Sequence, residues 1–273
     1  MKNLKRYRQL FESTEDLTQE QKDWLDRCTI DFYDDTIGTW KVNSQTGLVD
    51  VDGDFHCNNM RLNDLKGVRF GKVTGNFWCS RNNLTSLAGC PQEVGGTFNC
   101  YGNELSTLDG SPKKVTSTFD CSENELVSLK GISGVIGGSF YCHRNNLTSL
   151  EGLPNDLKIG GDFDCSKNKL KSFKGASNLV VKNLDCSDNN LTSLDGAPVA
   201  MGQIIASDNP ISRGMITRVL RMRGLGRTIE VAVHSLWGDT PDEDRIYLAK
   251  HHPTLPEDEK NIYRAMEINM KRR

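Results

Sequence analysis

Apolar and polar residues follow one repeated pattern through the middle of the chain, from about Val51 to Asp208. The first half of each copy alternates, as in Val73, Gly75, Phe77 and Cys79. An alternation of period two predicts a strand with one buried face. The first seven copies lie 21 to 23 residues apart. Repeats of this length predict a solenoid in which each copy forms one coil.

The second half of each copy breaks this alternation. In every copy but the first, an asparagine follows three residues after the cysteine position: Asn82, Asn103, Asn124, Asn145, Asn168, Asn189 and Asn209. We expect each buried amide to satisfy backbone groups of its own coil and of the next coil. Two leucines three residues apart, such as Leu84 and Leu87, are expected to fill the core. A glycine that closes most copies predicts a turn.

The copies include GNFWCSRNNLTSL from Gly75, GSFYCHRNNLTSL from Gly138 and a decayed eighth copy from Gly202. This spacing resembles the leucine-rich repeat family, with Phe and Cys at its two strand leucines. It is most similar to the short-repeat proteins of bacteriophages and bacteria. The resemblance covers about 160 of the 273 residues and implies a repeat solenoid with a layer of parallel strands. Here the apolar residue before Phe lies four residues back rather than three, which predicts a longer and flatter strand.

The two ends of the chain differ from this repeat. Residues 1–50 are expected to form an N-terminal α+β cap built from helices and a hairpin, and residues 51–211 a solenoid of about eight coils. In the cap, we expect helices over 3–11 and from Thr18 to about Cys28, where Thr18 and Gln21 form a capping box. Strands are expected over 39–42 and 48–51. Residues 212–273 are expected to form an α-helical region, with a strong helix start at Thr240 and Pro241.

Nine cysteines are present, and seven of them occupy one column of the repeat: Cys57, Cys79, Cys100, Cys121, Cys142, Cys165 and Cys186. The matching residue of the eighth copy is Ala206, which favours packing over chemistry. Paired zinc-ligand spacings such as C-x-x-C do not occur in the sequence. Reduced thiols, together with a polar and basic N-terminus and no long apolar run, predict a cytoplasmic protein.

Repeat proteins usually bind partners on the exposed side of their strand layer. Positions flanking Phe and Cys should point outward there, and they carry aromatic residues in the first five coils and aspartates in the later ones. This mixture is typical of a protein-binding face. The candidate partner-binding residues are His56, Trp78, Asn99, Tyr101, Asp120, Tyr141, His143, Asp162, Asp164 and Asp185.

Other sites are also open from the sequence. The aspartates could instead bind a cation such as Ca²⁺, although no EF-hand loop is present and no metal site is favoured. A basic run could contact nucleic acid or cover the last coil: Arg213, Arg218, Arg221, Arg223 and Arg227. The net charge of −2 favours neither nucleic acid nor membrane as a partner.

Enzymatic activity is not indicated, because no nucleophile elbow, phosphate-binding loop or dinucleotide fingerprint is present. The phrase from Asn145 is similar to repeats of secreted bacterial ubiquitin ligases, but no cysteine follows Cys186 to act as their nucleophile. We therefore expect a non-enzymatic, cofactor-free interaction module. If the resemblance to phage proteins holds, the partner would be a host protein that is inhibited or redirected. A nucleic-acid-associated protein and a structural component of a virion or assembly are the alternatives, and the oligomeric state stays open.

Overall fold

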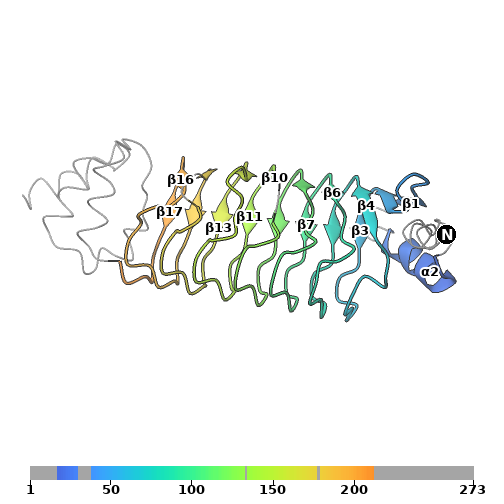
Figure 1. The fold of residues 1–273 in the computed structure, drawn as a ribbon, viewed down its shortest axis with the longest axis horizontal. Helices are drawn as coiled ribbons and strands as arrows, with labels where there is room; N and C mark the ends of the chain where they lie inside the picture. Colours follow the sequence, from blue (N-terminus) through green and yellow to red (C-terminus); the bar gives the residue numbers. More distant parts are fainter. Residues whose placement is uncertain (1–16, 30–37, 133, 177–178, 212–273) are drawn as a thin grey trace, which may run out of the picture.

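The computed structural model describes residues 17–29, 38–132, 134–176 and 179–211, which form a rod of stacked coils with a helix at one end (Figure 1). Each coil contributes one strand to each of two layers of mostly parallel strands and returns through a segment without a strand. Seven successive pairings join the eight strands of the longer sheet, so the chain completes about seven turns. The prediction of a repeat solenoid with parallel strands is confirmed.

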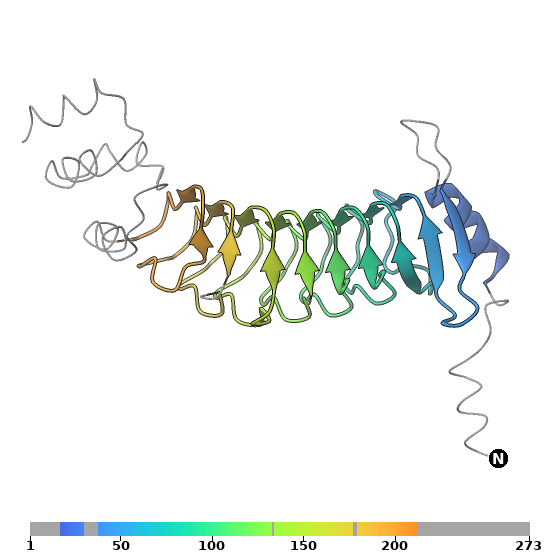
Figure 2. The same cartoon turned by 90° about the horizontal axis from the view of Figure 1, so that it is seen from above.

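The first sheet, here called the valine sheet, begins at the N-terminal end. Its strands are β1 (Thr39–Val42), β2 (Val49–Asp52), β4 (Phe70–Val73), β6 (Glu93–Val94), β8 (Lys114–Val115), β10 (Val135–Ile136) and β12 (Lys158–Ile159). β1 pairs with β2 in antiparallel fashion, and the others are parallel. β14 (Val180–Val181) and β16 (Val199–Ala200) pair separately. Figure 2 shows one strand of each coil in a row that starts at β1 and β2.

The second sheet, here called the phenylalanine sheet, runs along the whole rod. Its strands are β3 (Phe55–His56), β5 (Phe77–Trp78), β7 (Phe98–Asn99), β9 (Phe119–Asp120), β11 (Phe140–Tyr141), β13 (Phe163–Asp164), β15 (Leu184–Asp185) and β17 (Ile204–Ile205). The first residue of every strand is buried and the second is half-buried. Equivalent residues of neighbouring coils are in register.

Six phenylalanines form a continuous column inside the rod. Ring centroids of neighbouring coils lie 5.0 to 5.8 Å apart, from Phe55 to Phe163. The predicted cysteine column lies beside them, fully buried and with free thiols, and Ala206 is buried at the eighth position. Burial raises the pKa of the Cys121 and Cys165 thiols, and it raises the pKa of Cys28, outside the column, to about 12, so these three thiols are poor nucleophiles. The expected packing role is confirmed.

The strand is not longer and flatter, as the sequence predicted, but divided in two. Between β4 and β5 the chain turns a corner at Thr74 to Asn76. Asn76 holds the corner, because its amide donates to Asp54 and its Oδ1 accepts from the backbone N–H of Thr97, 2.7 Å away. The four-residue spacing from Val73 to Phe77 therefore carries the chain from one sheet to the other.

The asparagine ladder is confirmed. Asn145 is buried, and its Nδ2 donates to the carbonyl oxygens of Cys121 and Cys142, each 3.1 Å away. Its Oδ1 accepts from the backbone N–H of Leu126 at 2.9 Å. The neighbour bound in this way is the preceding coil, not the following coil as predicted. Each amide thus satisfies backbone groups that the bend after the strand would otherwise leave unpaired.

The first coil is covered by helix α2 (Gln19–Cys28). The helix begins with the predicted capping box of Thr18 and Gln21. Its Trp24 is buried edge-on against Phe55, with ring centroids 5.4 Å apart. The 39–42 and 48–51 strands are confirmed as β1 and β2, with β2 shifted by one residue. The helix predicted over 3–11 and the helical region over 212–273 lie outside the described residues.

Replacing Asn145 with alanine should lower the free energy of unfolding by about 2–4 kcal/mol, because buried carbonyl and N–H groups lose their partners. Aspartate at the same position should cost at least as much, since it can accept but cannot donate. Urea denaturation would measure both. Asn146→Ala is the control and should stay within about 0.5 kcal/mol of wild type. A mild effect of Asn145→Ala would contradict the ladder's structural role.

The closing glycines predict a second contrast. Gly131 has φ +99°, and a Cβ there would lie 2.3 Å from the backbone nitrogen of Asp109. Gly196 has φ +75° but no atom nearer than 4.0 Å. Gly131→Ala should therefore lower the free energy of unfolding by about 3–5 kcal/mol, and Gly196→Ala by about 1 kcal/mol. Thermal or urea unfolding would measure both. Equal costs would mean that backbone strain alone makes glycine necessary.

Candidate protein-binding face

Most of the predicted binding residues lie on the outer face of the phenylalanine sheet. Its central row, formed by the second residue of each strand, consists of His56, Trp78, Asn99, Asp120, Tyr141, Asp164, Asp185 and Ile205. Tyr101 and His143 belong to the adjacent row, two residues further along the chain. Because the strands are in register, the central residues stand beside one another along the rod.

In four of the first seven coils, the central residue is part of the fold. Asn99, Asp120, Asp164 and Asp185 each accept, through Oδ1, the backbone N–H of the residue two positions later. The distances from oxygen to nitrogen are 2.9 to 3.0 Å. Such a side-chain turn stabilises the bend that leaves the strand. These four predicted site residues therefore stabilise the bend after their strand.

The other three coils carry His56, Trp78 and Tyr141 instead, and these side chains lack the amide or carboxylate oxygen that makes the turn in the other coils. The rings of His56 and Trp78 meet edge to face, with centroids 4.3 Å apart. All three residues are half-buried, so part of each ring faces solvent. In these three coils the central row therefore lacks the Asn or Asp side chain that stabilises the bend in the other four.

His143 and Asp164 form a polar pair across neighbouring coils. The Nδ1 of His143 lies 3.3 Å from Oδ2 of Asp164. Hydrogen bonding to Asp164 raises the pKa of His143, against the opposing effect of burial. Burial acts to raise the pKa of Asp164, but the hydrogen bonds from His143 and Ser166 outweigh it and lower that pKa. A protonated His143 is therefore an ion-pair partner for Asp164.

A second network follows the edge of the face. The guanidinium of Arg81 lies 5.5 Å from the ring centroid of Tyr101. Glu123 is hydrogen-bonded by the Tyr101 side chain and forms an ion pair with Arg144, and these contacts lower the pKa of Glu123. The sequence reasoning did not find Glu123, because it lies at the bend rather than beside Phe or Cys.

Asp162 lies in the row of residues just before the phenylalanines, and side chains of this row form hydrogen bonds between neighbouring coils. Its Oδ1 accepts from Nδ2 of Asn183 at 2.7 Å. The carboxylates suggested for calcium are thus engaged by Asn183, Ser166 and Ser187. Among the described residues, no group of three or more histidines, cysteines or acids could hold a metal ion.

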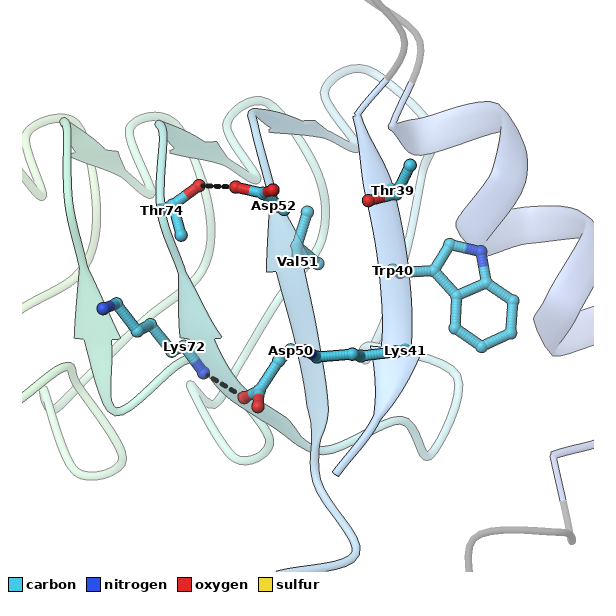
Figure 3. A pocket seen from close by; sticks show the side chains of 8 residues that line it. All are labelled: Thr39, Trp40, Lys41, Asp50, Val51, Asp52, Lys72 and Thr74. Atoms are coloured by element: carbon cyan, nitrogen blue, oxygen red, sulfur yellow. Dashed lines mark hydrogen bonds between the residues drawn. The ribbon is translucent and has the colours of Figure 1, made fainter. Parts of the chain in front are cut away.

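A pocket that the sequence did not indicate opens on the outer face of β1, β2 and β4 (Figure 3). Its volume is about 360 Å³, and it is lined by Thr39, Trp40, Lys41, Asp50, Val51, Asp52, Lys72 and Thr74. Asp50 and Asp52 are already engaged, by Asn43 and the Lys72 backbone and by Thr74. The pocket therefore offers two surface lysines but no preformed catalytic or metal-binding group.

No protein-family model matches the chain, and no curated protein matches it. The helix that the structure describes is too short and polar to cross a bilayer. The arginines of the basic run, Arg213 to Arg227, lie outside the described residues. The candidate site therefore consists of residues on the outer face of the phenylalanine sheet.

The His143–Asp164 pair predicts a pH-dependent contribution to stability. Because the pKa of His143 is raised above its ordinary value of 6.5, the contribution is full below that value and is lost as pH rises through the raised value. In urea denaturation, His143→Gln should therefore lower the free energy of unfolding more at about pH 5.5 than at about pH 8.5. Asp164→Asn should remove this difference. A cost that is equal at both pH values would contradict the pairing.

Proposed function

We propose that this protein is a non-enzymatic interaction module that binds a partner protein on the outer face of the phenylalanine sheet. The supporting observation is the departure of His56, Trp78 and Tyr141 from the Asn/Asp turn used in the other coils. A ring at these positions gives up a local hydrogen bond and leaves apolar surface in solvent, which costs stability unless something binds there.

Half-buried aromatic side chains are also what protein interfaces use as anchors. Trp78 packs against His56, and Tyr101 against Arg81, so their rings are held before a partner arrives. Preorganised side chains lose less conformational entropy on binding. The rod presents these anchors in two adjacent rows along one face, which suits an extended segment or a flat surface of a partner.

Following the resemblance to short leucine-rich repeats of phages and bacteria, we place the partner among host proteins of the bacterial cytoplasm. Binding would then inhibit or redirect that host protein. This part of the proposal rests on the sequence resemblance alone.

The test is affinity capture from bacterial lysate with the double variant Trp78→Asn/Tyr141→Asn. Asparagine occurs naturally at the equivalent Asn99, where it makes the side-chain turn, so the variant should fold. We expect that a partner captured by wild type is not captured by this variant. The free energy of unfolding of the Tyr141→Asn single variant should lie within about 1 kcal/mol of that of wild type.

The matched control is Val127→Ser/Val180→Ser, which removes two exposed apolar side chains that lie outside the face. It should capture the partner as wild type does. Loss of the partner in Arg218→Glu/Arg221→Glu alone would move the binding site to the basic run. Capture by wild type and by the aromatic variant alike would overturn the proposal. Self-association in light scattering, without any partner, would favour the structural-component alternative.

A further inference from the structure

Apart from His56 and His143, the three outward rows of the phenylalanine sheet carry charge of one sign. They comprise the residues just before the Phe position, between the Phe and Cys positions, and just after the Cys position of the eight coils. Among these positions, Asp54, Asp120, Asp162, Asp164 and Asp185 are acidic, and none is lysine or arginine. The chain as a whole has 34 basic and 36 acidic residues. The absence of lysine and arginine is therefore a property of this face and not of the composition of the chain.

The acidic and aromatic groups are interleaved at one place. Tyr141 is in register with Asp120 on one side and with Asp164 on the other, and Asp185 follows in the next coil. Neighbouring strands are about 4.8 Å apart, so a carboxylate stands on each side of the tyrosine ring. A cation over an aromatic ring is attracted by the ring's face and by nearby carboxylates together.

Asp120 and Asp185 each keep one carboxylate oxygen for a ligand. Asp120 and Asp185 use Oδ1 for the turn to Ser122 and Ser187. Among the described residues, Oδ2 of neither aspartate has a hydrogen bond or ion pair. Oδ2 of Asp164 faces His143 instead. The fold thus fixes the position of these carboxylates through one oxygen and leaves the other of Asp120 and Asp185 to solvent.

We infer that the partner binds through a basic segment, with a lysine or arginine side chain placed over Tyr141 between Asp120 and Asp164. This inference rests on the proposed function and assigns the chemistry of its partner. Charge complementarity selects the occupant. The five carboxylates of the face outnumber the two histidines, His56 and His143, that lie beside them, so an acidic segment would be repelled.

The test uses the full chain and a fluorescein-labelled nonapeptide in which arginine alternates with glycine, measured by fluorescence anisotropy. The comparison peptide has glutamate in place of arginine. We expect only the arginine peptide to bind, and its affinity to fall as salt screens the charges. Asp120→Asn/Asp164→Asn should weaken binding about tenfold, and Tyr141→Asn about threefold to tenfold.

These variants should retain the fold, because asparagine keeps the Oδ1 that accepts the turn N–H, as Asn99 does. The matched control is Asp109→Asn/Asp195→Asn, which changes the net charge equally at two exposed positions away from the sheet. This control should bind the peptide as wild type does. An equal loss in both double variants would show attraction to net charge only and would overturn the inference.

Failure of this inference can be distinguished from failure of the proposed function. A protein captured through Trp78 and Tyr141 by a chain that does not bind the arginine peptide would leave the function in place and overturn the basic-segment assignment. Self-association of the free chain that Asp120→Asn abolishes would make a second copy the occupant, and would overturn the assignment to a separate partner.

Discussion

The fold depends on the asparagine that follows every strand of the phenylalanine sheet except the first. A parallel solenoid must bend its chain sharply in every coil, and a bend buries backbone groups that a strand partner cannot reach. The amide of Asn145 and its equivalents supplies both donors and an acceptor to these groups, within its own coil and in the preceding one. Neither aspartate nor a hydroxyl side chain could supply that combination.

The same bends carry backbone strain. The residue just before each ladder asparagine has a positive φ, and in most coils it is not glycine: Arg81, Glu123, Arg144, Lys167, Asp188 and Asp208. Each costs about 1–2 kcal/mol, because Cβ approaches a carbonyl oxygen in this region. The neighbouring asparagine bonds fix the bend and offset this cost. The bend also turns charged side chains outward, which is how Glu123 and Arg144 come to pair between coils.

On the phenylalanine sheet, structure and recognition compete for the same positions. Aspartate or asparagine stabilises the bend through one oxygen, and aspartate also gives the face its charge through the second oxygen of the carboxylate. An aromatic residue gives up this stabilisation and supplies contact area instead. The recognition role that we propose for this face is therefore clearest at His56, Trp78 and Tyr141. Their side chains do not stabilise the bend, yet neighbouring residues hold them in place.

The sequence alone determined the solenoid, its period, the buried columns and the asparagine ladder, because each coil packs only against its neighbours and the pattern records those contacts. It also determined the capping box of α2, whose partners lie three residues apart. The two-sheet cross-section was decided by tertiary structure, since alternation continues through the corner at Gly75 and does not reveal the turn.

The relative placement of the candidate binding groups was also decided by tertiary structure. The pairing of His143 with Asp164, and the position of Tyr141 between two aspartates, depend on which coils are neighbours and on the register between their strands. The outward rows could be named from the sequence, because side chains alternate along a strand. Their half-burial and their hydrogen bonds could not be named, because they arise only when separate coils, each about 21 residues long, stack into one surface.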